Sequence, residues 1–395
     1  MKNRYDERAP RLGAGPAPSF PPLGGLALDD KIRLLTGADN WRTTGEDRLG
    51  LRPLAMSDGP AGVRGIVMDE RVPSSSLPCP SALGATWDPG LVAEVGAALG
   101  AEARAKNIDV LLAPTVHLMR TPLGGRGFEC FSEDPVLTAG IAAAYVRGVQ
   151  SAGVACAVKH YLCNESETQR WTFDVRVAGH VLRELYLVPF EACIREAGAA
   201  VVMAGYNSVN GATMTENTPL LTGVLKDEWG FAGVVLSDWH AARSTEATAL
   251  AGLDLAMPGP GGPWGEQLAA AVRAGRVPEE LIDDKVRRLL HLAGAVGAGE
   301  VDGADGAESG RRVDPGLLRR AAAAAFTLLR NEDGALPLDP AVGRLALIGP
   351  NAAYPVTQGG GSAQVPSAGA PTPAQALRSA LAGQAEVTVE PGCIT

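Results

Sequence analysis

The chain has 395 residues, of which 46% are hydrophobic, and 35 Lys and Arg against 44 Asp and Glu give a net charge of −9. It contains no basic run, no RNA-binding motif and no stretch of about 18 apolar residues, so neither a nucleic-acid partner nor a membrane-spanning helix is expected. Its length favours more than one domain. The six cysteines form no C-x-x-C pair, and no apolar signal segment is present, so we expect a cytoplasmic protein.

Residues 1–25 are charged and then rich in Gly and Pro, which predicts a flexible leader. A helix is predicted from Leu28, and short apolar runs then alternate with helical patterns. The runs lie at 54–56, 108–113, 154–158, 199–204, 234–236 and 253–257. Strands that alternate with helices predict a parallel sheet, and this many repeats predict an α/β fold with a (β/α)8 TIM-barrel-like domain over residues 26–298.

Polar residues that a plain turn does not require follow these runs. Because the carboxyl ends of parallel strands share one face of a barrel, we expect them to meet there. In chain order they are Asp58 and Arg64, Arg126 and Glu129, Lys159 and His160, Tyr206 and Asn207, and Asp238 and Trp239.

Each of these residues also has an ordinary structural explanation. Asp238 suits a helix cap for a predicted helix at 239–248, and Asp58 suits a turn between Ser and Gly-Pro. Arg126 and Glu129 suit an ion pair that fixes a loop, and the pair Lys159-His160 suits hydrogen bonds to loop carbonyls. Only the joint placement of all these residues at successive strand ends favours a sugar pocket with one carboxylate at the anomeric carbon.

The composition shifts to Gly, Ala and Asp near residue 295, so residues 299–325 are predicted to be a linker and a connecting helix, the helix running from 315 to 330. A strand at 345–348, a helix at 373–382 and a strand at 386–390 follow. We interpret residues 326–395 as the start of an α/β sandwich domain that is incomplete, because two strands and one helix bury too little apolar surface to stand alone.

Cofactor and metal sites are not expected. The stretch 124–127 is glycine-rich but lacks the G-K-[ST] ending of a phosphate loop, and the five histidines form no H-E-x-x-H pair.

Taken together, these motifs resemble those of glycoside hydrolase family 3, in its β-glucosidase and β-xylosidase branch. The resemblance runs from about residue 28 to 366. It rests on Ser57-Asp58-Gly59-Pro60, Gly125-Arg126, Ser132-Glu133-Asp134-Pro135, Lys159-His160, Ser237-Asp238-Trp239 and Gly359 to Ala363.

The resemblance implies a retaining mechanism in which Asp238 is the nucleophile that forms a covalent glycosyl-enzyme. It also implies a set of residues that hold the sugar in subsite −1. These are Asp58, Arg126, Lys159 and His160, with Tyr206 beside the nucleophile and Arg64 and Trp239 flanking the pocket.

The family's acid/base is a Glu from the second domain in the β-glucosidase branch, expected beyond Thr395, or a second His after the Lys-His strand in the N-acetylglucosaminidase branch. The loop after Lys159-His160 has no such His. Glu129, Glu133 and Glu165 lie in the right neighbourhood, with no ground to select one.

We therefore expect part of an exo-acting β-glucosidase that hydrolyses terminal β-D-glucosyl residues, with little turnover of unactivated glycosides by this chain alone. The alternatives are a β-xylosidase or another exo-glycosidase of the family, or a catalytically silent sugar-binding protein. A homo-oligomer is compatible with the sequence.

Overall fold

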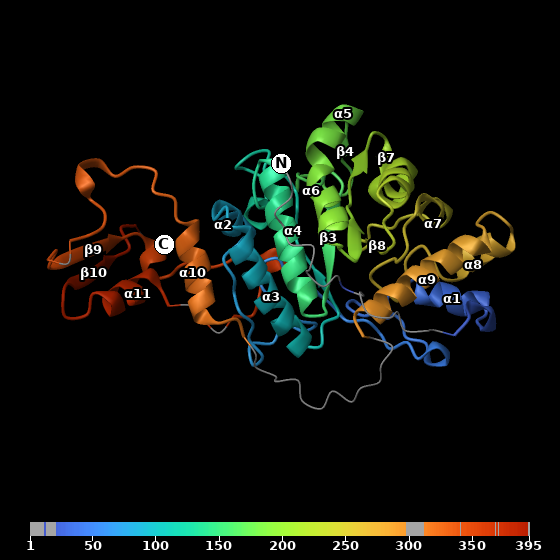
Figure 1. Cartoon of the computed structure of the whole chain (residues 1–395), viewed down its shortest axis with the longest axis horizontal. Helices are drawn as coiled ribbons and strands as arrows, with labels where there is room; N and C mark the ends of the chain where they lie inside the picture. The colour runs from blue at the N-terminus through green and yellow to red at the C-terminus, as the bar shows by residue number, and fades with distance from the viewer. Residues whose placement is uncertain are drawn as a thin grey trace.

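The computed structural model describes residues 12, 21–297, 312–339, 341–367, 369 and 371–393. Up to residue 297 these form one large α/β domain, and from residue 326 a smaller unit lies to one side of it, beyond α10 (Figure 1). Most of the predicted leader at 1–25, and the first part of the predicted linker up to residue 311, lie outside the described residues.

The elements alternate between strand and helix along most of the chain. The strands are β1 (Met56–Asp58), β2 (Val110–Leu112), β3 (Ala155–Tyr161), β4 (Asp174–Val175), β5 (Val201–Ala204), β6 (Ser208–Val209), β7 (Ala212–Thr213), β8 (Val234–Ser237), β9 (Arg344–Ile348) and β10 (Glu386–Glu390). The α-helices are α1 (Leu28–Leu34), α2 (Pro80–Ala85), α3 (Pro89–Ala105), α4 (Pro135–Ser151), α5 (Gly179–Val181), α6 (Val188–Glu191), α7 (Glu246–Ala251), α8 (Glu266–Arg273), α9 (Glu279–Ala295), α10 (Pro315–Ala325) and α11 (Pro373–Ala380).

The core of the large domain is a parallel sheet with the order β1-β2-β3-β5-β8 among the described residues. The predicted run at 253–257 lies beside β8 through a single bridge between Leu236 and Leu255, and Ala256 bridges on to Thr36. Helices surround this sheet (Figure 1). The prediction of a TIM-barrel-like domain is therefore confirmed, with the last predicted run forming bridges in place of a strand.

Helices α3 and α4 pack closely because glycines face each other at their contact. A Cβ added at Gly148 would lie 2.3 Å from the carbonyl oxygen of Ala93, and one at Gly96 would lie 2.7 Å from that of Tyr145. Each helix begins with an aspartate whose carboxylate accepts a backbone N–H three residues on, followed by proline. Local sequence thus sets where both helices begin.

Two predicted helices differ from the structure, and one further helical segment is irregular. The segment predicted as a helix after Asp238 turns instead, with His240 at a φ of +65°, and α7 begins only at Glu246. The stretch around Pro189 alternates short α-helices with the π-helical turns η4 (Leu182–Tyr186) and η5 (Ala192–Glu196). Helix α10 ends at Ala325, five residues before the predicted end at 330. In the segment after Asp238, tertiary contacts of the residues that follow β8 override helix propensity.

The smaller unit is the predicted β-α-β arrangement. β9 and β10 pair in parallel, and α11 connects them after a capping box between Thr372 and Gln375. No residue of β9 is buried, and its Ile348 is 76% exposed. This agrees with the expectation that residues 326–395 bury little apolar surface by themselves.

One loop of the smaller unit returns to the large domain. Ser74 pairs with Ser367 through a parallel bridge, and its N–H donates to the Pro366 carbonyl at 2.6 Å. A Cβ added at Gly359 would lie 2.2 Å from the ring of Phe128. Residues 358–363 therefore lie against the loop that follows β2.

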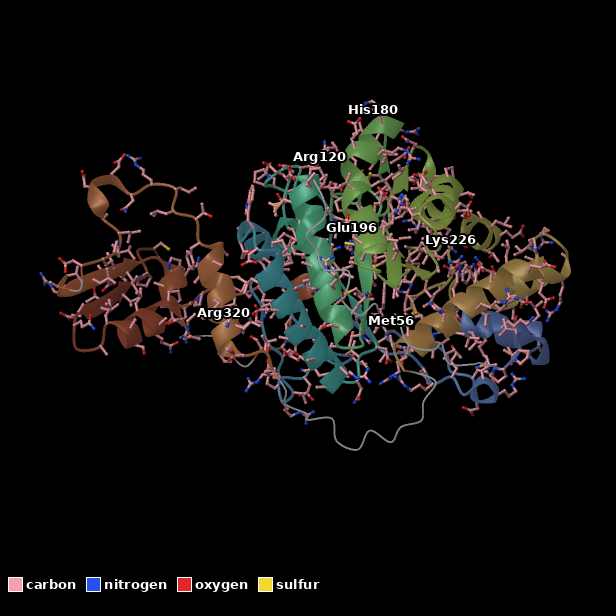
Figure 2. The ribbon with its side chains drawn as sticks, viewed as in Figure 1. Met56, Arg120, His180, Glu196, Lys226 and Arg320 are labelled. Carbon is pink, nitrogen blue, oxygen red and sulfur yellow. The ribbon has the colours of Figure 1, made fainter. Side chains whose placement is uncertain are left out.

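The strands run toward one end of the large domain. Figure 2 places Arg120, on the loop after β2, and His180 toward one end, and Met56, the first residue of β1, toward the other. The residues predicted to form the site follow the strands and so belong to the first of these ends. In the part of the chain that the structure describes, no helix has the length and apolarity to cross a bilayer.

Candidate active site

A pocket of about 200 Å³ opens among the carboxyl ends of the strands. All eight residues predicted from the sequence line it, and six others join them. The predicted residues are Asp58, Arg64, Arg126, Lys159, His160, Tyr206, Asp238 and Trp239, and the others are Asn40, Trp41, Leu112, Arg170, Met203 and Ser362.

Asp58 ends β1 and is buried between two cations. Lys159, on β3 and itself buried, donates from Nζ to Asp58 Oδ1 at 3.2 Å. Arg64 Nη1 lies 3.6 Å from Asp58 Oδ2, and the Arg64 N–H donates to the Asp58 carbonyl at 3.0 Å. Asp58 thus closes its own turn and also orients a lysine and an arginine toward the pocket, so its turn-forming and binding interpretations are compatible.

Arg126 is held in the loop after β2 by an ion pair. Its Nη2 and Nε donate to the two Glu129 carboxylate oxygens at 2.6 and 3.1 Å, and both side chains are largely buried. Burial raises the pKa of Glu129, but the Arg126 charge and its hydrogen bonds, with Lys159, more than offset this and hold the pKa below its usual value. Glu129 is therefore an ionised anchor for Arg126.

His160 is a neutral imidazole whose tautomer follows from its neighbours. Burial lowers its pKa well below the usual value, and the charge of Arg126 lowers it further. Arg126 Nη1 lies 3.2 Å from His160 Nε2, and because a guanidinium only donates, Nε2 must accept. Nδ1 then carries the proton and donates to His117 Nε2 at 3.0 Å. His117 thus fixes the ring that faces the pocket.

Asp238 follows β8 with its carboxylate directed into the pocket. Oδ1 accepts the Trp239 N–H at 2.7 Å, the Tyr206 hydroxyl donates to the carboxylate, and Oδ2 lies 3.4 Å from His160 Nε2. Burial raises the pKa of Asp238, whereas the Lys159 and Arg126 charges and these donors oppose the rise. Because α7 begins eight residues later, Asp238 does not cap a helix, and the structural alternative for it is wrong.

Aromatic rings flank this carboxylate. The Trp239 Nε1–H donates to the Asn40 carbonyl at 2.9 Å, and its ring lies 5.4 Å from that of Trp41. The ring of Tyr206, whose hydroxyl donates to Asp238, lies 4.1 Å from the ring of Trp171. A pocket of one sugar's size, with a carboxylate, flanking rings and several cations, has the composition expected for binding a saccharide.

Comparison with known proteins agrees with this geometry. Residues 24–292 match the glycosyl hydrolase family 3 N-terminal domain, and residues 326–390 match the glycosyl hydrolase family 3 C-terminal domain. The chain belongs to glycosyl hydrolase family 3. The resemblance inferred from the sequence motifs is confirmed.

The family 3 relatives and solved structures that this chain matches are longer than the chain itself. It is 46% identical to a β-glucosidase of Rhizobium radiobacter, over 94% of this chain and 46% of that protein. A β-glucosidase of Kluyveromyces marxianus in complex with glucose superposes with a TM-score of 0.86 at 36% identity, covering 93% of this chain and 45% of that one. β-Glucosidase 3B of Thermotoga neapolitana in complex with glucose superposes with a TM-score of 0.84 at 33% identity, covering 92% of this chain and 54% of that one. The chain spans about half the length of the relatives it matches.

Four of the residues that line the pocket were not predicted from the sequence. Asn40 and Trp41 come from the segment after α1, which follows no strand of the sheet. Arg170 lies in an irregular segment ten residues beyond His160, and Ser362 comes from the smaller unit. The only signal for Ser362 was the glycine run before it, which belongs to the motifs of the family 3 resemblance.

The three glutamates considered as acid/base candidates lie outside the pocket lining. Glu129 is paired with Arg126, and Glu133 lines a separate hollow that also contains Arg120. Burial raises the pKa of Glu165 to about 7, opposed in part by the Arg120 charge. A group with this pKa can act as an acid, but Glu165 is not among the residues that line the pocket.

Within the described residues, no group of three or more His, Cys, Asp or Glu side chains is arranged to hold a metal ion. His160, which lines the pocket, bonds to His117 and to Arg126.

Proposed function

We propose that this chain is the sugar-binding and nucleophile-bearing part of a retaining, exo-acting β-glucosidase. One observation carries the proposal: the buried Asp238 carboxylate lies in a pocket of about 200 Å³, where seven other residues that follow the strands supply charged groups, hydrogen-bond donors and acceptors, and aromatic rings. Family 3 relatives named as β-glucosidases, two of them solved with glucose, support the choice of sugar.

The geometry suits attack by Asp238 on an anomeric carbon. The Trp239 N–H and the Tyr206 hydroxyl orient the carboxylate, and neutral His160 leaves it without a direct ion pair. One oxygen of Asp238 forms a bond to C1 while the bond from C1 to the leaving oxygen breaks, which produces a glycosyl-aspartate. Water later releases the sugar.

The hydroxyls of the sugar require both donors and acceptors. Asp58 accepts, while Lys159, Arg126 and Arg170 donate. Ion pairs of Lys159 with Asp58, of Arg126 with Glu129 and of Arg170 with Glu167 fix these head groups in place before the sugar binds. Contacts of this kind that tighten as the ring approaches an oxocarbenium ion favour the transition state over the ground state.

The leaving group determines how far the reaction proceeds. Asp58 and Asp238 are the carboxylates among the described residues that line the pocket, and Asp58 is engaged by Lys159 and Arg64. A phenol with a low pKa leaves without a proton, whereas an alkyl alcohol needs one. We therefore propose that the chain forms a glycosyl-enzyme from activated aryl glucosides and hydrolyses alkyl glucosides little or not at all.

Trapping tests the proposal. Incubation of the chain with 2,4-dinitrophenyl 2-deoxy-2-fluoro-β-D-glucoside, followed by peptide mass spectrometry, should place the sugar on Asp238. Asp238→Asn is the control and should remain unlabelled. Labelling of another residue, or no labelling of a chain that binds glucose, would reject the assignment; the second result would favour the silent sugar-binding protein.

The second candidate within the family is a β-xylosidase. The matched 2-deoxy-2-fluoro-β-D-xyloside, which lacks the C6 hydroxymethyl group, separates the two. Faster labelling by the glucoside supports the β-glucosidase, and faster labelling by the xyloside supports the alternative. Rapid hydrolysis of methyl β-D-glucoside by the unmodified chain would contradict the proposed dependence on the leaving group.

A further inference from the structure

His117 is a buried histidine that lies behind the sugar pocket and is not part of its lining. It belongs to the segment after β2, which runs beside β3: Thr115 forms a parallel bridge with Lys159, and the Val116 N–H donates to the Lys159 carbonyl at 2.9 Å. The next residue, His117, is 3% exposed, and its ring centroid lies 4.9 Å from that of His160. Since His160 lines the pocket, His117 can act on a bound sugar through this neighbouring ring.

The hydrogen bonds of His117 determine which ring nitrogens carry protons. Its Nε2 accepts the backbone N–H of His160 at 2.9 Å, and because a backbone N–H can only donate, this nitrogen has no proton of its own. Burial and the charges of Arg126 and Lys159 lower the pKa of His117, which keeps the ring neutral. The same Nε2 lies 3.0 Å from His160 Nδ1, so Nδ1 must supply the proton of that hydrogen bond. The tautomer of His160 is therefore fixed from behind as well as by Arg126.

On the pocket side, Nε2 of His160 has two neighbours that require opposite protonation states. Arg126 Nη1 lies 3.2 Å away and can only donate, whereas the Asp238 oxygen Oδ2 lies 3.4 Å away and, when ionised, can only accept. With the proton on Nδ1, Nε2 accepts from Arg126 and forms no hydrogen bond to Oδ2. With the proton on Nε2, the ring would donate to Oδ2 and direct an N–H at the guanidinium. The tautomer of His160 therefore decides whether this oxygen of Asp238 is free.

We propose that His117 is a positioning residue for the reaction: it holds the proton of His160 on Nδ1, away from Asp238, and so keeps Oδ2 available for attack on the sugar. This inference rests on the proposed function. A hydrogen bond from His160 to Oδ2 would stabilise the carboxylate before the reaction and would weaken as its charge passes into the new bond with C1. Such a bond favours the ground state over the transition state and would raise the barrier.

Loss of the acceptor at position 117 should reverse the preference of the His160 proton. In His117→Leu, a proton on His160 Nδ1 would belong to a buried N–H without a partner, which is unfavourable. A proton on Nε2 would instead form a charge-assisted hydrogen bond to Asp238, stronger than the bond to a neutral imidazole that it replaces. One proton moves between two nitrogens of one ring, so the net charge of the pocket stays the same. In His117→Gln the side-chain amide oxygen can accept in place of Nε2, so the original tautomer should return.

Nuclear magnetic resonance of isotope-labelled histidine side chains in the full 395-residue chain reads the tautomer directly. The chain has five histidines, and the signals that vanish in His160→Gln belong to His160. We expect the His160 proton on Nδ1 in the unmodified chain and in His117→Gln, and on Nε2 in His117→Leu. A proton on Nε2 in the unmodified chain would overturn the proposal, whether or not His117→Leu folds.

The rate of attack is measured in the same variants by release of 2,4-dinitrophenolate from 2,4-dinitrophenyl 2-deoxy-2-fluoro-β-D-glucoside, and glucose binding is measured by calorimetry. We expect His117→Leu to slow the release about ten- to hundredfold, the effect of one hydrogen bond to a charged group. The Kd of glucose should change less than about threefold, because a sugar hydroxyl can accept from Nε2 as well as donate to it. His117→Gln should recover most of the rate.

His180→Asn is the control, because His180 is exposed on α5 (Figure 2), and it should change neither the rate nor the affinity. If His117 only supports the fold, His117→Leu will weaken glucose binding as much as it slows the release, or His117→Gln will be as slow as His117→Leu. Either result would overturn the proposal, as would a His160 proton that stays on Nδ1 in His117→Leu. No release by the unmodified chain would instead reject the proposed function, and the resonance measurement, which needs no turnover, distinguishes that failure from failure of this inference.

Discussion

Removal of the Arg126 side chain tests whether the pocket depends on a buried ion pair. In Arg126→Met, Glu129 keeps a 3.2 Å hydrogen bond from Thr115 but loses both bonds from the guanidinium. The Glu129 side chain is 3% exposed, so water cannot replace them. Breaking a buried pair in this way costs about 3–5 kcal/mol, and we expect the free energy of unfolding to fall by that amount at pH 7.

The dependence on pH follows from the direction of the Glu129 pKa shift. In the unmodified chain this pKa lies below its usual value, so the stabilisation is fully present above pH ~4.5 and is lost only as the pH falls through the lowered pKa. In Arg126→Met burial acts without the arginine and raises the pKa. The penalty should then shrink by up to about 1.4 kcal/mol for each pH unit below the raised pKa, because the carboxyl group takes up a proton.

Equilibrium urea unfolding at pH 7 and pH 5, followed by tryptophan fluorescence, measures both effects. The double variant Arg126→Met with Glu129→Leu removes the orphaned charge and should recover most of the loss. Arg183→Met is the exposed control: its bidentate pair with Glu228 has side-chain exposures of 54% and 45%, and its removal should lower the free energy of unfolding far less than Arg126→Met does. A loss below about 1 kcal/mol in Arg126→Met, or the same loss at both pH values, would refute the reasoning.

Three further substitutions test other parts of the fold. Lys226 donates to the buried Asp254 carboxylate at 2.6 Å, so Lys226→Met should cost about 3–5 kcal/mol in urea unfolding. Lys285→Met should cost less, because Lys285 Nζ lies 3.9 Å from Asp254 and donates instead to the Leu253 carbonyl. Burial lowers the pKa of Lys285 to about 8, so the unfolded chain binds more protons between pH 8 and 10.5, and stability should rise over that range unless Lys285 is replaced. Gly359→Ala places a methyl group 2.2 Å from the Phe128 ring, which should displace the loop and weaken glucose binding severalfold by calorimetry; an unchanged affinity would contradict the assigned loop contact.

The strand-end residues could be predicted because two local signals coincide there. An apolar run followed by polar residues, such as Lys159-His160 or Asp238-Trp239, predicts both where a strand ends and which side chains follow it. Parallel strands then bring those ends together without further information. This is why all eight predicted residues line one pocket.

Arg170 and Trp41 could not be predicted in this way, because no strand ends beside them. Their positions depend on long-range contacts: the Arg170 guanidinium lies over the ring of Tyr206, and Trp41 packs on Trp239. The same contacts explain the wrongly predicted helix after Asp238. The indole of Trp239 bonds to Asn40 across the opening, and this holds the segment out of helical geometry.

The distribution of charge explains how the pocket can stabilise the ionised form of Asp238 while leaving its carboxylate free to react. Lys159 donates to Asp58, and Arg126 is committed to Glu129, so each cation has its direct partner elsewhere. The carboxylate itself accepts only from neutral donors, the Trp239 N–H and the Tyr206 hydroxyl. A direct salt bridge would occupy the carboxylate lone pairs that attack the sugar in the proposed reaction. Cations that lie near Asp238 without bonding to it instead stabilise its buried negative charge through space. The ion pairs around the pocket are therefore part of the same arrangement as the proposed nucleophile, and a change in any of them should alter the affinity for protons at Asp238.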